Sequence, residues 1–128
     1  MRRKRDDEGA SAVELALVMP VLLLILFGII EFGLAFSRNI AITNAAHEGA
    51  RVVSLDGADA EETVRRTSGF AEDEQDDIAV TVDYDCDGSG VDAQVSVHYE
   101  HEFTVLGGLA FFGIDHVDLE ATAVEKCV

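Results

Sequence analysis

The sequence has little positive charge beyond its first few residues. Of its nine lysines and arginines, four are Arg2, Arg3, Lys4 and Arg5, and from Asp56 onward three basic residues stand against 19 aspartates and glutamates. A surface this acidic repels the phosphates of nucleic acids and the headgroups of anionic lipids. The composition therefore argues against nucleic acid as a partner and favours a soluble C-terminal part.

The chain also lacks the motifs of a catalytic site. Its 128 residues contain no evident nucleophile beside a general base, no phosphate-binding loop and no internal repeat. If a short leader is removed and about 45 residues form one helix, only about 70 residues remain, which is near the lower limit for an unassisted core. We therefore expect one small domain on a stalk, with no enzymatic activity and no cofactor.

One long hydrophobic run is present near the N-terminus. Residues Leu15 to Ile30 carry no charge, and the apolar character continues past Glu31 to Phe36. As a helix, residues 13–36 would be roughly 36 Å long, enough to span the hydrocarbon core of a membrane. A cleaved secretory signal has a shorter core followed by a small-residue cleavage site, and no such site follows here. We therefore predict a retained transmembrane segment at residues 13–36.

Two residues interrupt the regularity of this segment. Pro20, the only proline, removes one backbone donor and clashes with the carbonyl of Ala16, so we expect a kink there. Glu31 is a second acidic residue within the run, and a charge at this depth needs water or a partner. We expect Glu31 at the membrane interface or paired with a neighbouring subunit.

Both cysteines, Cys86 and Cys127, follow the apolar run. Because a basic cluster precedes the run, we expect the N-terminus in the cytoplasm and the C-terminal region outside, where disulfides persist. A bridge between the two cysteines would close a loop of about 40 residues and stabilise the domain by roughly 3–4 kcal/mol. The alternative is two unpaired thiols.

After the apolar run the pattern changes from helical to β. The helix is expected to continue through residues 39–53, with an apolar side formed by Ile40, Ile42, Ala45, Ala46, Ala50 and Val53. The further predicted elements are a helix at 60–67 begun by Asp59, a solvated acidic turn at 72–77, strands at 78–84, 91–105 and 116–124, and an apolar loop or helical turn at 106–113. We predict an α+β fold: a long N-terminal helix followed by a small antiparallel β-sheet domain.

The start of the hydrophobic run has the layout of a prepilin signal. A basic leader ends at Gly9, and Glu14 follows five residues later. A charge within a membrane segment costs roughly 2.5–3.5 kcal/mol, so it usually has a function and a partner. In this layout a peptidase cleaves after Gly9, and Ala10 becomes the N-terminus. The chain then divides into a leader (1–9), a helix (10–55) and an acidic extracytoplasmic domain (56–128). The alternative for Glu14 is a solvated position at the membrane edge.

Three segments of the first 53 residues carry a family resemblance. They are Glu8–Pro20 (EGASAVELALVMP), Phe27–Gly33 (FGIIEFG) and Asn44–Arg51 (NAAHEGAR). Together they resemble the N-terminal region of TadE-like proteins, the pilin-like minor components of tight-adherence (Flp) pilus assembly and secretion systems. The C-terminal half shows little of this resemblance beyond its strand pattern.

The resemblance implies a prepilin-peptidase substrate that is anchored in the cytoplasmic membrane and reaches the cell surface in an assembled pilus. Its partners would be other pilin-like subunits, contacted through the N-terminal helix, the inner-membrane assembly platform and membrane lipid. Glu14 would align the subunit by pairing with the freed amine of Ala10, on a neighbour or in the same chain. Type IV pilins commonly have Phe in place of Ala10, so methylation of the new N-terminus is not implied.

A cation-binding loop is an alternative interpretation of one acidic segment. Asp83, Asp85 and Asp87 alternate before Gly88, as in an oxygen-rich calcium loop, but the twelfth position is Gln94 rather than a bidentate carboxylate. An acidic hairpin turn explains the same residues. The alternative function is therefore a membrane-anchored extracytoplasmic domain that binds cations, which retention of the leader would favour.

A zinc site is less well supported. On a strand, His98, Glu100 and Glu102 project to one side and His101 to the other, so both histidines cannot converge on one ion. A solvated strand face accounts for these side chains. We therefore predict no metal ligands among them.

Overall fold

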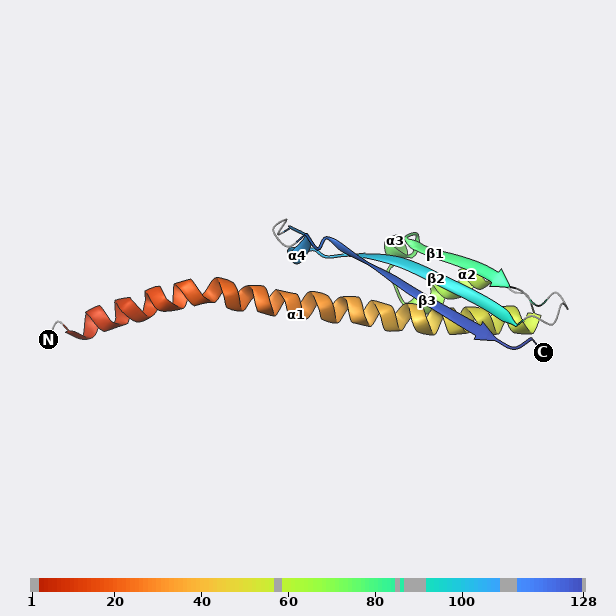
Figure 1. Ribbon diagram of the computed structural model, residues 1–128, viewed down its shortest axis with the longest axis horizontal. Coiled ribbons are helices and arrows are strands. Elements are labelled where there is room, and N and C mark those ends of the chain that lie inside the picture. Colours follow the sequence, from red (N-terminus) through yellow and green to blue (C-terminus); the bar gives the residue numbers. More distant parts are fainter. Residues whose placement is uncertain (1–2, 57–58, 85, 87–91, 109–112, 128) are drawn as a thin grey trace.

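The protein, in a computed structural model, consists of one very long helix with a small domain along its C-terminal half (Figure 1). The structure describes residues 3–56, 59–84, 86, 92–108 and 113–127. The N-terminal half of the long helix, α1 (Arg3–Asp56), extends away from the domain. The predicted α+β class, a long N-terminal helix followed by a small antiparallel sheet, is confirmed.

Helix α1 has 54 residues and runs without interruption past Pro20. At about 1.5 Å per residue it is roughly 80 Å long. Figure 1 shows that α1 changes direction within its N-terminal half. A proline that removes one intrahelical hydrogen bond is a physical cause of such a bend. The assignment of the kink to Pro20 itself stays a prediction.

The sheet is a three-stranded antiparallel meander in the order β1-β2-β3. Its strands are β1 (Ile78–Tyr84), β2 (Ala93–Glu102) and β3 (His116–Glu125). The central strand is shorter than the predicted 91–105. It ends at Glu102. The amide of Phe103 still donates to the carbonyl of Asp115, 2.8 Å away, and the chain then enters a helical turn, α4 (Val105–Gly108). The predicted turn at Asp87–Gly90 lies outside the described residues.

One face of the sheet packs directly on α1, and the residues of β2 and β3 alternate as predicted. On β1 the prediction is wrong at Val82, which is exposed. On β2 the buried side chains are those of Ala93, Val95, Val97 and Tyr99. The facing part of α1 is built from small residues, Ala45, Ala46, Gly49 and Ala50, all of them buried. Small side chains let the sheet approach the helix closely, and this contact forms the centre of the hydrophobic core.

The predicted apolar side of α1 is correct except at Ile40. Ile42 is fully buried, whereas half of the Ile40 side chain is exposed. Two residues are separated by about 200° around a helix, so Ile40 and Ile42 lie on opposite sides. Ile40 therefore belongs to the outward face of α1, not to the core.

Two short helices complete the domain. The carboxylate of Asp59 accepts hydrogen bonds from the amides of Glu61 and Glu62 and so caps α2 (Ala60–Ser68), which ends at Gly69 with a left-handed φ of 69°. The predicted solvated acidic turn at 72–77 is instead a helical turn, α3 (Glu72–Gln75). It is not wholly solvated, because Glu74 pairs with Arg38 of α1.

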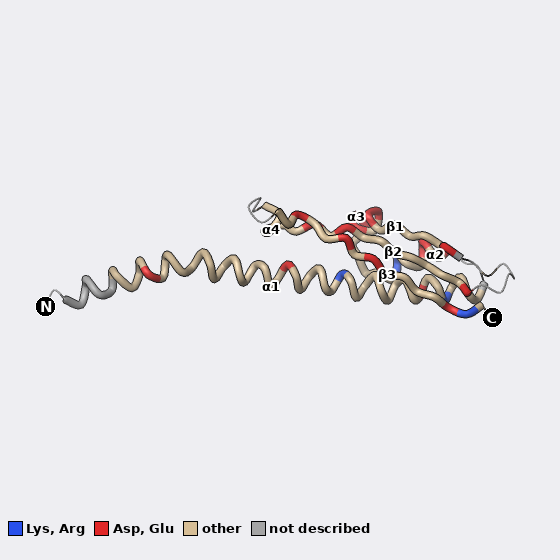
Figure 2. Tube along the Cα trace, viewed as in Figure 1, with Lys and Arg blue, Asp and Glu red and all other residues tan. Residues whose placement is uncertain are grey.

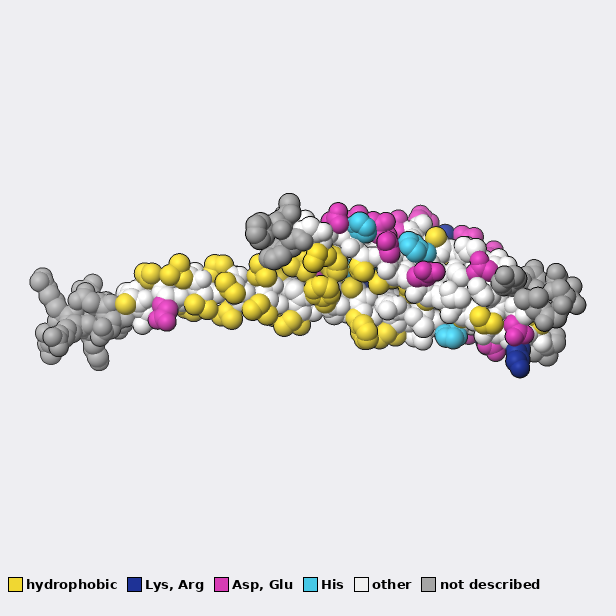
Figure 3. All heavy atoms as spheres, viewed as in Figure 1, with side chains coloured by type: hydrophobic (Ala, Val, Ile, Leu, Met, Phe, Trp, Pro, Cys, Tyr) yellow, Lys and Arg dark blue, Asp and Glu magenta, His cyan; other side chains and the backbone are white. Residues whose placement is uncertain are grey.

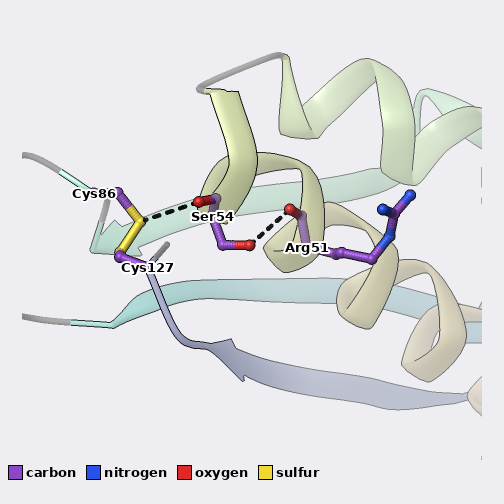
Figure 4. The surroundings of a disulfide bond; sticks show 4 residues. All are labelled: Arg51, Ser54, Cys86 and Cys127. Carbon is purple, nitrogen blue, oxygen red and sulfur yellow. Dashed lines mark hydrogen bonds between the residues drawn. A yellow bond between two sulfur atoms is a disulfide. The ribbon is translucent and has the colours of Figure 1, made fainter.

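A disulfide bond joins Cys86 and Cys127, the pairing expected from the sequence. The two residues are 41 positions apart, and their Cα atoms are separated by 5.6 Å. Figure 4 shows the bond beside the C-terminal end of α1, where the sulfur of Cys86 lies 3.9 Å from the carbonyl oxygen of Ser54. The bridge therefore fixes the segments after β1 and β3 close to the end of the long helix.

Candidate functional site

The N-terminal half of α1 presents uncovered hydrophobic side chains on all sides. Its exposed large apolar residues are Val13, Leu15, Leu17, Val18, Met19, Val21, Leu22, Leu23, Ile25, Leu26, Phe27, Ile29 and Ile30. The mean hydropathy of the most apolar window reaches 2.8, and none of that window is buried by the rest of the chain. Figure 3 shows these side chains along the free part of the helix. Such a helix is long and apolar enough to cross a membrane once, which suggests single-pass anchoring.

The expected processing and alignment residues all lie on this free part of α1. Gly9, Ala10 and Glu14 are exposed, and a Cβ atom built on Gly9 would meet nothing within 4 Å. Among the described residues, no hydrogen bond or ion pair engages the Glu14 carboxylate. Ala10 and Glu14 are four residues apart and therefore share one face of the helix, about 6 Å apart along its axis. The cleavage and alignment roles of these residues stay predictions.

Glu31 has a partner that the sequence did not reveal. Its side chain is only 6% exposed. One carboxylate oxygen accepts a hydrogen bond from the amide of Val105, and the other accepts one from the amide of Leu106 at 2.9 Å. These are the first amides of α4, whose donors have no partner within the helix itself. Glu31 thus caps α4 from α1 within its own chain. Its position at the membrane interface stays a prediction.

Around Glu31 the end of the apolar run packs against the domain. Ala35 of α1 forms a small buried cluster with Phe103 and Leu106. The rings of Phe32 and Phe103 are 5.4 Å apart at their centroids and tilted by 57°, a favourable aromatic geometry. The last part of the predicted transmembrane segment therefore also forms the junction between α1 and the domain.

Two apolar hollows flank this junction. The larger, of about 580 Å³, is lined by Leu24, Ile25, Gly28, Ile29, Phe32, Leu106 and Ile114. A second, of about 280 Å³, shares Phe32 and Ile114 and continues toward β3. The lining of the larger hollow contains no charged or hydrogen-bonding side chain, so it can accommodate hydrocarbon but cannot orient a polar ligand.

A polar groove of about 670 Å³ lies on the other side of the domain, near Arg38. The Arg38 guanidinium donates to Glu74 at 2.7 Å and lies 4.3 Å from the centroid of the Phe70 ring. Burial, together with the positive charge of Arg38, lowers the pKa of His101, and burial raises the pKa of Tyr99. The residues around Arg38 connect α1, α3 and β2, and we assign them a structural role.

Of the acidic and histidine residues considered as metal ligands, those that the structure describes are not assembled into a site. Asp83 accepts hydrogen bonds from the Ser96 hydroxyl at 2.6 Å and from Gln94 at 3.3 Å. Asp85, Asp87 and Gly88 lie outside the described residues. Within the described ranges, no group of three or more histidine, cysteine or acidic side chains is placed to hold an ion.

The β2 histidines that were considered for a zinc site, and not predicted to form one, lie in two different surroundings. His98 lies 3.8 Å from Asp118 on the exposed face of the sheet. His101 faces the other way and packs edge-on against Phe103, with ring centroids 5.6 Å apart. Figure 2 shows acidic residues spread along the strands and α3 rather than gathered at one point.

The comparisons with known proteins agree with the N-terminal resemblance. Residues 9–51 match the family model of the TadE-like proteins. The matched segment begins at Gly9, includes Glu14 and Glu31, and ends within the part of α1 that carries the sheet. No curated protein and no solved structure matches the chain. The resemblance to TadE-like proteins is therefore confirmed for the helix, and the sheet domain lies outside the match.

Proposed function

We propose that this protein, with its TadE-like N-terminal segment, is a minor pilin-like structural subunit of a tight-adherence (Flp, type IV) pilus assembly or secretion system. The observation that carries the proposal is the family match at residues 9–51, which falls on the long apolar helix. The subunit assembles through α1 and displays its acidic domain. No residue of the chain is assigned a catalytic role.

Processing by a prepilin peptidase is the first step of this proposal. The peptidase cuts between Gly9 and Ala10, and the chain loses the four basic residues of its leader. Both residues are exposed in a helical part of α1, so the helix unwinds locally before the bond is cut. Glycine is the least costly ordinary residue to unwind, because it destabilises a helix by about 1 kcal/mol relative to alanine.

Glu14 then serves to align the subunit in the assembly. Cleavage creates a positive amine at Ala10, and the only charged side chain in the first part of the span is the Glu14 carboxylate. Each charge lowers the cost of burying the other in a medium of low dielectric constant. The pairing is available within one chain, because the residues are four apart, and also between adjacent subunits.

The orientation follows from charge and redox chemistry. The basic leader keeps the N-terminus in the cytoplasm. The disulfide between Cys86 and Cys127 belongs in an oxidising compartment, so the domain faces outside the cytoplasmic membrane. The partners are other pilin-like subunits, the prepilin peptidase, the inner-membrane assembly platform and membrane lipid, and the acidic surface disfavours nucleic acid.

The alignment role can be tested with Glu14→Gln, which removes the charge and keeps the size. Glu48→Gln is the matched control, because Glu48 pairs with Arg51 on the exposed side of α1 outside the span. We expect the Glu14 variant to be inserted and processed but to lose co-purification with the other pilin-like subunits, while the control retains it. Co-purification of the Glu14 variant at the wild-type level would contradict the alignment role.

A further inference from the structure

Helix α4 lies beside the apolar run of α1, not beyond its end. Its first two amides bind Glu31, which is 17 positions after Glu14 and therefore roughly 26 Å farther along the helix. The hydrocarbon core of a membrane is about 30 Å thick. If Glu14 is near one edge of that core, α4 is near the opposite edge.

The larger apolar hollow lies still deeper. Its lining residues on α1 are Leu24, Ile25, Gly28, Ile29 and Phe32. Leu24 is seven positions before Glu31, so the hollow extends about 10 Å from the Glu31 level toward the centre of the span. The residues from the domain that close it are Leu106 and Ile114. This hollow therefore opens into the region that acyl chains occupy around the rest of the helix.

Leu106 and Ile114, which close the hollow, belong to a stretch of sequence that differs in composition from the rest of the domain. From Val105 to Ile114 the sequence VLGGLAFFGI has no charged residue, although the chain as a whole has a formal net charge of −16. Val105 and Ile114 are 37% and 43% exposed. Transfer of such side chains from water into hydrocarbon is favourable by about 25 cal/mol per Å² of apolar surface.

The first two amides of α4 are bonded in a way that suits a medium without water. An unpaired amide costs several kcal/mol in hydrocarbon, so an irregular segment can reach this depth only where its donors are satisfied. The amides of Val105 and Leu106 bind Glu31, and the amide of Phe103 binds the carbonyl of Asp115. The Glu31 carboxylate is in turn shielded from lipid by the groups that it binds.

We propose that α4 and Ile114 form a second membrane contact, which inserts into the leaflet on the domain side of α1 and binds phospholipid acyl chains. The uncharged segment and the continuity of the hollow with the uncovered span favour lipid over a second copy of the chain. The proposal rests on anchoring by α1 and is independent of pilus assembly. In this arrangement the domain lies against the membrane surface, and α1 does not hold it away from that surface.

Tryptophan fluorescence tests the contact, because the chain contains no tryptophan. Ile114→Trp and Val105→Trp are reconstituted as full-length protein, one copy per nanodisc, in zwitterionic lipid with brominated acyl chains. Val82→Trp is the matched control, because Val82 at the other end of the domain is 44% exposed, like Ile114. Retention of the sheet is checked by circular dichroism for each variant.

We expect brominated lipid to reduce the fluorescence of the tryptophans at positions 105 and 114 at least threefold. The fluorescence of the tryptophan at position 82 should stay unchanged. Quenching of the two reporters no stronger than at Val82 would overturn the proposal. A blue-shifted emission without quenching would also overturn it, because protein would then cover the site. Adding Glu31→Gln to the Ile114 reporter should reduce its quenching. Glu14→Gln should not change the quenching, which separates this result from a failure of the assembly role.

Discussion

Replacing Glu31 by glutamine should open the junction between α1 and α4 without unfolding the sheet. The carboxylate is buried and accepts hydrogen bonds from the amides of Val105 and Leu106. A hydrogen bond to a charged group contributes about 1.5–3 kcal/mol, roughly twice the contribution of a neutral one. Glutamine keeps the size but has one oxygen and no charge. We therefore expect the free energy of opening α4 to fall by about 2 kcal/mol.

Amide hydrogen exchange measures this opening residue by residue. A loss of about 2 kcal/mol corresponds to roughly 30-fold faster exchange of the Val105 and Leu106 amides, if exchange follows local opening. The amide of Val97, in the middle of the central strand, should keep its rate. Glu48→Gln is the control, since the Glu48 side chain is partly exposed and bonds only to Arg51 among the described residues.

Two results would refute the reasoning about Glu31. Unchanged exchange at Val105 and Leu106 would mean that the carboxylate does not hold α4. An equal acceleration at Val97 would mean that the substitution destabilises the whole domain, so that Glu31 is not a local cap.

Three further predictions concern the domain. Cys127→Ser removes a cross-link between residues 41 positions apart and should lower the free energy of unfolding by about 4 kcal/mol in the chain-entropy model. Thermal melting should show a lower midpoint for this variant, and reductant should lower the wild-type midpoint equally. Gly49→Ala places a Cβ atom 2.7 Å from a methyl group of Val64 and should cost about 1–3 kcal/mol by overpacking. Gly33→Ala, with nothing within 4 Å, should not lower the denaturation midpoint of the domain. Burial lowers the pKa of His101 below its usual 6.5, so just below pH 6.5 the unfolded state binds more protons than the folded state. The free energy of unfolding should therefore fall as the pH drops through that value. His101→Gln should flatten this pH dependence, and an unchanged dependence would contradict the role given to His101.

Local patterns were sufficient to predict most of the fold. Period-two alternation placed the buried faces of β2 and β3, as with Val95 and Val97 on β2. On β1 it placed Ile78 and Val80, but Val82, predicted on the same face, is 44% exposed where the register shifts. Turn chemistry placed the limits of α2, because Asp59 can cap a helix and Gly69 can adopt a left-handed conformation. The family resemblance was confirmed because it depends on a continuous segment, residues 9–51.

The sequence did not predict the contacts between distant segments. Glu31 and its amide partner Leu106 are 75 positions apart, and Arg38 and Glu74 are 36 apart. Hydrophobic periodicity identifies which face of an element is buried, but it contains no information about which element covers that face. For the same reason the domain could not be placed beside the apolar run, and Glu31 was expected at the interface or against a neighbouring subunit.

The most direct test of the central claim is the N-terminus of the protein extracted from membranes of cells with an active prepilin peptidase. Intact mass and N-terminal sequencing should give a chain that starts at Ala10, and reductant should add about two daltons as the disulfide opens. A chain that still starts at Met1 would contradict processing as a prepilin. The protein would then be anchored in the membrane by α1 but would not assemble into a pilus.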